Sequence, residues 1–179
     1  MKHIFSVAAL TALMLAGPAQ IKGFNAMAEE ANTPAAPELT HVLSGRVDIG
    51  PPRAMGDTPT GSRREIPITG GTFTGPDFSA SVLPGGSDWQ LQRADGGLEV
   101  VAEYTLQTDD GVIIRVLNQG ISFQPGETRD RYTMTSPSFE APVGKYQWLN
   151  EAIFVGTLRL SPDTPPKVLI DVFRVDPVS

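Results

Sequence analysis

The 179-residue chain is long enough for one domain with a single core, since 40% of its residues are hydrophobic. With 20 acidic and 14 basic side chains it has a formal net charge of −6, which disfavours binding to a phosphate backbone. The lack of cysteine excludes disulfides and thiolate chemistry, and a multi-histidine metal site is excluded because His3 lies in the predicted secretion signal, residues 1–28, and only His41 is left. We therefore expect no nucleic-acid partner, no metal and no bound cofactor.

The first residues have the pattern of a secretion signal. An apolar run from Ile4 to Ala16 is too short to span a membrane but has the length of a signal-peptide core. Small residues at Ala26-Met27-Ala28 suit a signal peptidase, so residues 1–28 are predicted to be removed. An uncleaved membrane anchor is the alternative. The mature protein, starting at Glu29, is expected to be periplasmic or secreted, without membrane contact after cleavage.

The remaining chain divides into a linker and one β domain. Residues 29–38, EEANTPAAPE, have no apolar periodicity and are typical of a flexible linker. From 39 to 179 the sequence alternates short β-branched or aromatic runs with Gly, Pro, Asp and Asn, and no helical stripe is evident. Nine strands are predicted, over residues 39–48, 64–69, 79–83, 89–93, 98–107, 112–118, 131–135, 146–160 and 168–175.

The connections favour an antiparallel barrel. Asp95-Gly96-Gly97 and Asp109-Asp110-Gly111 supply residues that tolerate tight hairpin turns, and GPPRAMGDTPTGS, residues 50–62, predicts a long loop. Gly156 predicts a bend or bulge in the long 146–160 strand. Closing about nine strands into a single all-β antiparallel barrel leaves no exposed edge and can enclose one small ligand. An open sandwich is the alternative.

Alternation along the strands predicts which side chains face the interior. In residues 98–107, Tyr104 shares the apolar face with Val100 and Leu106. In residues 112–118, Asn118 ends an otherwise apolar row and Arg115 lies on the opposite side.

The segment from Tyr146 predicts a ligand pocket. As a strand, it places Tyr146, Trp148 and Asn150 on one face, so that two aromatic walls accompany an amide that can donate and accept hydrogen bonds. Alternatively the aromatic rings fill the core and Asn150 bonds a neighbouring backbone.

The stretch VLPGGSDWQLQRADG, residues 82–96, places a carboxylate beside a tryptophan after a predicted turn at Pro84-Gly85-Gly86. Asp88 is either a cap of this turn or, with Glu140, one of two acid–base groups. If both turns lie at one barrel end, Asp88, Trp89, Glu140, Tyr146 and Trp148 converge there. Residues 50–62 then form a lid over the site.

Four motifs together resemble the domain of unknown function 3237 family. They are RREIPITGGTFTGP, VLPGGSDWQLQRADG, YTLQTDDGVIIRVLNQG and FEAPVGKYQWLNEAIFVGTLR, in this order. The resemblance covers about residues 39–175 and implies a lipocalin-like antiparallel barrel. It implies no settled activity and no catalytic residues, and Ala80-Ser81 stands where a glycine is expected.

Three functions are consistent with the sequence. The first is an exported barrel that binds a small aromatic or hydroxylated organic molecule through Trp89, Tyr104, Asn118, Tyr146, Trp148 and Asn150. The second is a metal- and cofactor-independent lyase, isomerase or hydrolase that uses Asp88 and Glu140 as acid and base. The third is a structural homodimer with an incidental pocket.

Overall fold

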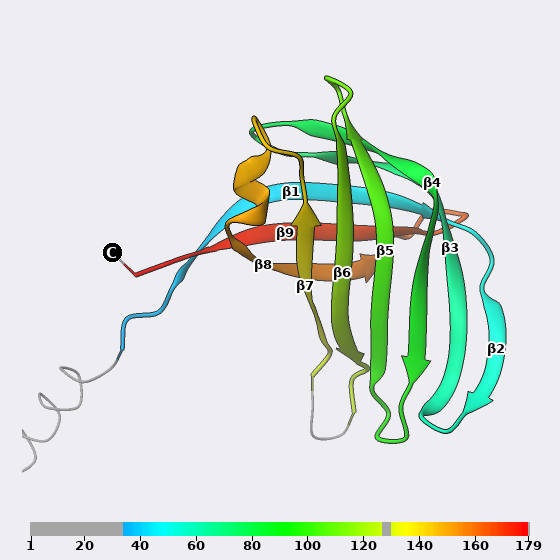
Figure 1. The fold of residues 1–179 in the computed structure, drawn as a ribbon. Helices are drawn as coiled ribbons and strands as arrows, with labels where there is room; N and C mark the ends of the chain where they lie inside the picture. Colours follow the sequence, from blue (N-terminus) through cyan, green and yellow to red (C-terminus); the bar gives the residue numbers. More distant parts are fainter. Residues whose placement is uncertain (1–33, 127–129, 179) are drawn as a thin grey trace, which may run out of the picture. The chain divides into compact units, whose positions relative to one another are not determined.

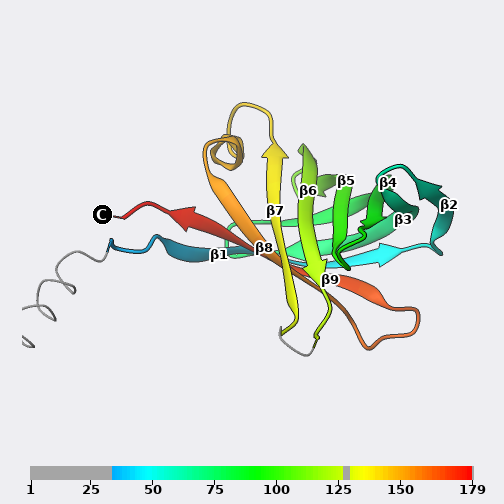
Figure 2. The ribbon, with the colours of Figure 1, turned by 90° about the horizontal axis from the view of Figure 1, so that it is seen from below.

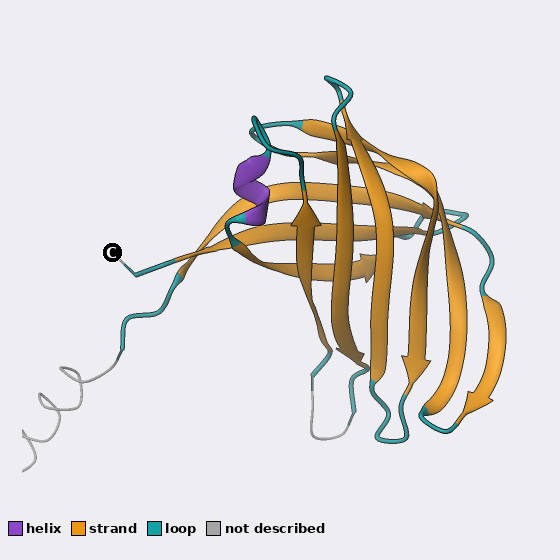
Figure 3. Ribbon diagram, viewed as in Figure 1, coloured by secondary structure: helices purple, strands orange, loops and turns teal. Residues whose placement is uncertain are grey.

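The computed structural model describes residues 34–126 and 130–178, and nearly all of their regular structure is antiparallel β-sheet (Figures 1 and 3). The predicted signal peptide and most of the predicted linker lie outside the described residues. The elements are β1 (Glu38–Ile49), β2 (Arg53–Thr58), β3 (Gly61–Thr74), β4 (Ser79–Gln92), β5 (Leu98–Thr108), β6 (Ile113–Phe123), β7 (Tyr132–Glu140), the 3-10 helix η1 (Gln147–Asn150), β8 (Ile153–Leu160) and β9 (Lys167–Asp176). None of the described helical segments is long and apolar enough to cross a membrane.

Eight of the strands close into a barrel. The hydrogen-bonded order is β1-β9-β8-β7-β6-β5-β4-β3-β2, and β1 also pairs with β3, so that β2 remains outside the closed ring. Figure 1 shows β5, β6 and β7 running across the direction of β1, β9 and β8. The predicted all-β antiparallel barrel is confirmed.

The predicted long loop at residues 50–62 is wrong, because this segment forms β2 and the start of β3. Arg53 pairs with Glu65 and Thr58 pairs with Gly61, which makes a short hairpin despite the Gly and Pro content. The proposed lid is thus an edge hairpin of the sheet.

The predicted turn at Pro84-Gly85-Gly86 is also wrong, because β4 continues through it. The pairing of β4 with β5 shifts register between Leu83 and Ser87, and Gly85 has a φ of 111°. A Cβ on Gly86 would lie 2.5 Å from the carbonyl oxygen of Glu103. The glycines therefore form a bulge that lets two strands approach closely, instead of reversing the chain.

The predicted strand over residues 146–160 begins only at Ile153. The pairing of β7 with β8 is limited to Met134 with Thr157 and Thr135 with Gly156. The two strands separate beyond these pairs, and η1 lies between their diverging ends (Figure 2). The chain is helical here because Tyr146 and Leu149, three residues apart, both bury their side chains in the core.

The barrel interior has an apolar half and a polar half. The apolar half, at the end that carries η1, contains the aromatic and aliphatic side chains Phe73, Phe78, Tyr104, Leu106, Ile114, Val116, Tyr146, Leu149 and Phe154. Nearer the β4–β5 turn, the polar side chains Asp88, Gln90, Asn118 and Thr135 occupy inner positions beside the buried Ile66 and Val100. The predicted inward faces of residues 98–107 and 112–118 are confirmed by burial of Tyr104, Ile114 and Asn118.

Candidate functional site

A row of polar side chains crosses the inner face of the sheet from β3 to β7. Asp88 on β4 faces Ala102 on β5, and Ala102 faces Asn118 on β6. Two residues beyond Asp88 on β4, Gln90 faces Arg64 on β3. Alternate residues of a strand share a face, so these side chains project to the same side of the sheet.

A hydrogen-bonded chain links the arginine to the acid. Arg64 donates from Nε to Oε1 of Gln90 at 2.7 Å, and Gln90 donates from Nε2 to Oδ2 of Asp88 at 2.6 Å. The other carboxyl oxygen of Asp88, Oδ1, is buried and accepts no hydrogen bond from the described residues.

Burial raises the pKa of the Asp88 carboxyl above its ordinary value of 3.8. The Gln90 amide, the Val101 backbone N–H and the charge of Arg64 act in the opposite direction, but burial is the largest cause. Asp88 therefore holds a proton at a higher pH than an exposed aspartate, as a group that donates a proton to a ligand requires.

Two further polar atoms on the inner face are buried without partners among the described residues. They are Oδ1 of Asn118, whose residue is only 2% exposed, and Oγ1 of Thr135 on β7. Buried polar atoms without hydrogen bonds are costly, so these two atoms leave unused hydrogen-bonding capacity on the inner faces of the neighbouring strands β6 and β7. The described residues hold no group of three or more acidic or histidine side chains that could bind a metal ion.

A cleft of about 290 Å³ opens beside this polar chain. We call it the inner-face cleft; its lining residues, from β2 to β5, are Ala54, Ser62, Arg63, Arg64, Gln90, Gln92 and Leu98. Its volume is close to the lower end of the range of small-molecule pockets, roughly 300–1,000 Å³. Asp88 does not line the cleft itself and is connected to it through Gln90, which lines the cleft and donates a hydrogen bond to the Asp88 carboxyl group.

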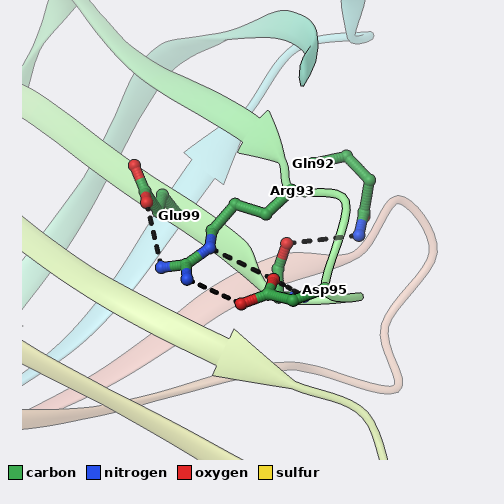
Figure 4. A network of polar contacts seen from close by, with 5 residues as sticks. Gln92, Arg93, Asp95 and Glu99 are labelled. Carbon is green, nitrogen blue, oxygen red and sulfur yellow. Dashed lines mark hydrogen bonds and ion pairs between the residues drawn. The ribbon is translucent and has the colours of Figure 1, made fainter. Parts of the chain in front are cut away.

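The β4–β5 turn at the cleft is held by ionic contacts (Figure 4). Arg93 pairs with Asp95 at 2.6 Å and with Glu99 at 3.2 Å. The Gly97 N–H and then the Arg93 guanidinium lower the pKa of Asp95, so this carboxylate stays charged. Gln92, a cleft residue, donates to the Gly97 carbonyl at 3.2 Å. This network fixes the ends of β4 and β5 that border the cleft.

Glu140 and Trp89 do not join Asp88. Glu140 lies on the outer face, where it pairs with Arg115 at 3.2 Å, and Arg115 also pairs with Glu103 at 2.8 Å. Trp89 follows Asp88 in the strand, faces outward and is 42% exposed. The predicted convergence is therefore wrong, and Asp88 is the one carboxylate of the predicted pair that lies on the inner face.

The residues around η1 close the opposite end of the barrel. Tyr146 packs against Phe78 and donates its hydroxyl to Asp110 in the β5–β6 turn at 2.8 Å. Trp148 packs against the core with its ring centroid 6.2 Å from that of Phe154. Their predicted shared strand face is wrong, because residues 147–150 are helical.

Asn150 uses both ends of its amide on the chain itself. Its Oδ1 accepts from the Ala141 backbone N–H at 2.8 Å, and its Nδ2 donates to the Ala141 carbonyl at 2.9 Å. Asn150 thus holds the β7–η1 loop, in agreement with the alternative interpretation of the sequence.

Tyr104 lies on the inner face as predicted, two residues along β5 from Ala102. Its ring stacks on Phe73 with the centroids 6.0 Å apart, and complete burial raises the pKa of its hydroxyl. Tyr104 belongs to the apolar half, adjacent to the polar ladder that carries Asp88.

Sequence reasoning missed Arg64, Gln90 and Thr135. Each of them is a polar side chain at an inward position of a strand. Alternation identifies such a position only when the strand and its register are known.

A family profile, related sequences and a solved structure all relate this chain to the same family. A family profile described as "Protein of unknown function (DUF3237)" matches residues 37–175. The UPF0311 protein of Rhodopseudomonas palustris (strain ATCC BAA-98 / CGA009) is 38% identical over 150 residues, covering 77% of this chain and 96% of that protein. A solved structure of a conserved R. palustris protein of unknown function superposes with a TM-score of 0.72 at 39% identity, covering 80% of this chain and 99% of the other.

Two further proteins are similar to this chain at lower identity. A beta-barrel like protein from Acinetobacter baumannii superposes with a TM-score of 0.70 at 29% identity, covering 81% of this chain and 99% of the other. The hydroalkoxylation enzyme phnH of Penicillium herquei is 27% identical over 124 residues, which cover 69% of this chain and 76% of that enzyme.

Proposed function

Because the chain belongs to the DUF3237 family of proteins of unknown function, and carries a partly buried acid, Asp88, that is hydrogen-bonded to a residue of the cleft, we propose that it is an enzyme acting on a small organic molecule. The substrate binds in the inner-face cleft, and Asp88 transfers protons to and from it.

The observation that supports this proposal is the buried Oδ1 of Asp88, which has no hydrogen-bond partner among the described residues. A carboxyl group used only to stabilise the fold would be expected to have both oxygens satisfied. Here Oδ2 is held by Gln90, which fixes the orientation of the group, while Oδ1 remains for a ligand.

One carboxyl group suffices for a reaction without net redox change. In its neutral form, Asp88 gives its proton to a carbon of a double bond while an alcohol oxygen of the substrate bonds to the adjacent carbon. The alcohol proton then returns to the carboxylate, so that the acid is regenerated and all atoms are retained. This is the addition of O–H across C=C, the chemistry named for the P. herquei relative. The same acid supports the reverse elimination or a double-bond shift.

The test is turnover by an isosteric variant. Purified protein is incubated with 2-allylphenol, 4-vinylphenol and small hydroxy acids, and the products are followed by proton NMR. Asp88→Asn is expected to reduce turnover about 100-fold or more, the range for removal of an acid–base group. Glu140→Gln, the matched outer-face control, is expected to retain the parent rate. Equal rates for Asp88→Asn and the parent would rule out this role, and a substrate that binds without turnover would indicate a binding protein.

We also propose that the protein acts outside the cytoplasm, on the strength of the apolar run at residues 4–16 and the Ala26-Met27-Ala28 site. Intact-mass measurement of the protein expressed in a Gram-negative host is expected to give a chain that starts at Glu29 in the periplasmic fraction. A chain that retains residues 1–28 in the cytoplasmic fraction would contradict this.

A further inference from the structure

Arg64 differs from most arginines of the barrel in having no acidic partner. Six others pair with a carboxylate, and these are Arg46, Arg53, Arg93, Arg115, Arg159 and Arg174. Among the described residues, none of the acidic side chains forms an ion pair with Arg64. Its hydrogen bond goes instead to the neutral amide of Gln90. Although the protein has 20 acidic side chains, the Arg64 guanidinium in the cleft has no ion-pair partner among the described residues.

The bond to Gln90 also orients the guanidinium. Since Nε is occupied, the four N–H donors on the two Nη atoms remain for other acceptors. These donors lie in one plane, which matches the two oxygens of a carboxylate, and the pair can form two parallel charge-assisted hydrogen bonds. The side chain is exposed at the inner-face cleft, so such an acceptor can reach it from solvent.

Other groups around the cleft are compatible with an anion. Arg63 lines it as well, and the remaining lining side chains are neutral. Glu65, next in sequence, lies on the opposite face of β3 and is engaged by Ser87 and Arg53. Asp88 is the acid nearest along the hydrogen-bonded chain, and Gln90 separates it from Arg64.

We propose that the inner-face cleft selects organic carboxylates, with the guanidinium of Arg64 binding the carboxylate and the body of the ligand extending past Gln90 toward Asp88. This rests on the proposed function, since it names the substrate class of the same site. Arg64 is a specificity residue here, and Asp88 is the reacting group.

The test uses two ligands of the same shape. The protein is titrated with 4-fluorobenzoate and 4-fluorobenzamide, and binding is followed by fluorine NMR line width and shift. The benzoate is expected to bind about tenfold or more tightly than the benzamide. Arg64→Gln is expected to remove this preference while leaving the affinity for the benzamide unchanged, and Arg64→Lys, which keeps the charge but not the planar donors, is expected to give an intermediate value. Arg115→Gln, which removes an outer-face arginine, is expected to retain the parent preference.

Equal affinity for the two ligands in the parent, or an unchanged preference in Arg64→Gln with an unchanged melting temperature, would overturn the inference. The two experiments also distinguish failure of this inference from failure of the proposed function. If benzoate selection depends on Arg64 while Asp88→Asn retains full turnover, the anion subsite stands and the proton-transfer role falls. If Asp88→Asn abolishes turnover of 2-allylphenol while the acid and the amide bind alike, the reverse holds.

Discussion

At the scale of single residues, the features that suit Asp88 to its proposed role are expected to lower the stability of the fold. Its carboxyl group is buried, one oxygen has no partner among the described residues, and burial raises its pKa. A charged carboxylate in this position is penalised in the folded protein and not in the unfolded chain. The residue is therefore expected to destabilise the fold once it ionises.

The pH dependence follows from the direction of this shift. The unfolded chain loses the Asp88 proton near pH 3.8, whereas the native protein loses it at a higher pH. Between these two pKa values the native state binds more protons, so the contribution of Asp88 to the free energy of unfolding falls as the pH rises. Below pH 3.8 that contribution is fully present. The side-chain amide of the Asp88→Asn variant does not ionise in this range, so the variant lacks this pH dependence.

Asp88→Asn is consequently expected to gain stability relative to the parent as the pH rises above 3.8, with a constant difference once Asp88 is fully ionised. Urea denaturation of both proteins between pH 3.5 and pH 8 measures this difference. A difference that does not change with pH would show that Asp88 titrates alike in the folded and unfolded chains. Because the same substitution is expected to reduce turnover about 100-fold or more, it separates stability from activity.

The sequence predicts the inward positions of Tyr104 and Asn118 because each lies in an uninterrupted alternating strand. It does not predict that Arg64 and Gln90 are neighbours, since 26 residues separate them and only the β3–β4 register brings them together. The partners that orient Asp88 therefore depend on long-range pairing, which local patterns do not contain.

At the scale of elements, η1 is a short helix that depends on side-chain clamps. Its four residues are too few for a self-supporting helix, so packing and hydrogen bonds must hold it. Tyr146 ties it to Asp110, whose pKa is lowered by Thr108, Lys145 and Tyr146. Asn150 ties it to Ala141.

Asn150→Ala removes both hydrogen bonds to the Ala141 backbone and is expected to lower the free energy of unfolding by about 1–2 kcal/mol. Because η1 lies at the barrel end opposite the inner-face cleft, turnover and benzoate affinity are expected to be unchanged. Gln147→Ala, which removes a single exposed contact with Glu151, is the control and is expected to change stability by less than about 0.5 kcal/mol. Urea denaturation compares the three proteins, and loss of benzoate binding in Asn150→Ala would link η1 to the site.

The errors in element prediction have a common cause. Pro84-Gly85-Gly86 has turn composition, but the flanking residues remain paired with β5 on both sides, so the glycines become a bulge within one strand. Apolar and polar residues alternate in the YQWLN stretch as they do in a strand. However, β7 and β8 diverge at this point, so no strand is in place to pair with it. In both segments the partner strand, and not the local composition, determines the structure.

At the scale of the whole molecule, the barrel depends on the seam between β1 and β3. Val47 pairs with Gly71, which has a φ of 128°, and a Cβ on Gly71 would lie 2.3 Å from the carbonyl oxygen of Arg46. Only a residue without a side chain allows the two strands to approach this closely in this backbone conformation.

Gly71→Ala is expected to lower the free energy of unfolding by about 2–4 kcal/mol, since it combines backbone strain with a clash across the seam. Gly85→Ala is the matched control, because Gly85 also has a positive φ, 111°, but has open space where the Cβ would be. Its cost is expected to be only about 1–2 kcal/mol. Hydrogen exchange of the β1 and β3 amides should report faster opening in Gly71→Ala alone; equal exchange in both variants would argue against a seam-specific effect.

The apolar half of the barrel also has a kinetic consequence. Phe78, Tyr146 and Leu149 are buried at the barrel end that carries η1, whereas the inner-face cleft is lined by residues next to the β4–β5 turn. Under the proposed function, we expect substrate to enter and product to leave through this open side of the cleft, so that a product molecule must leave before the next substrate binds. Product is accordingly expected to act as a competitive inhibitor, and the steady-state rate is expected to depend on product release as well as on the proposed proton transfer at Asp88.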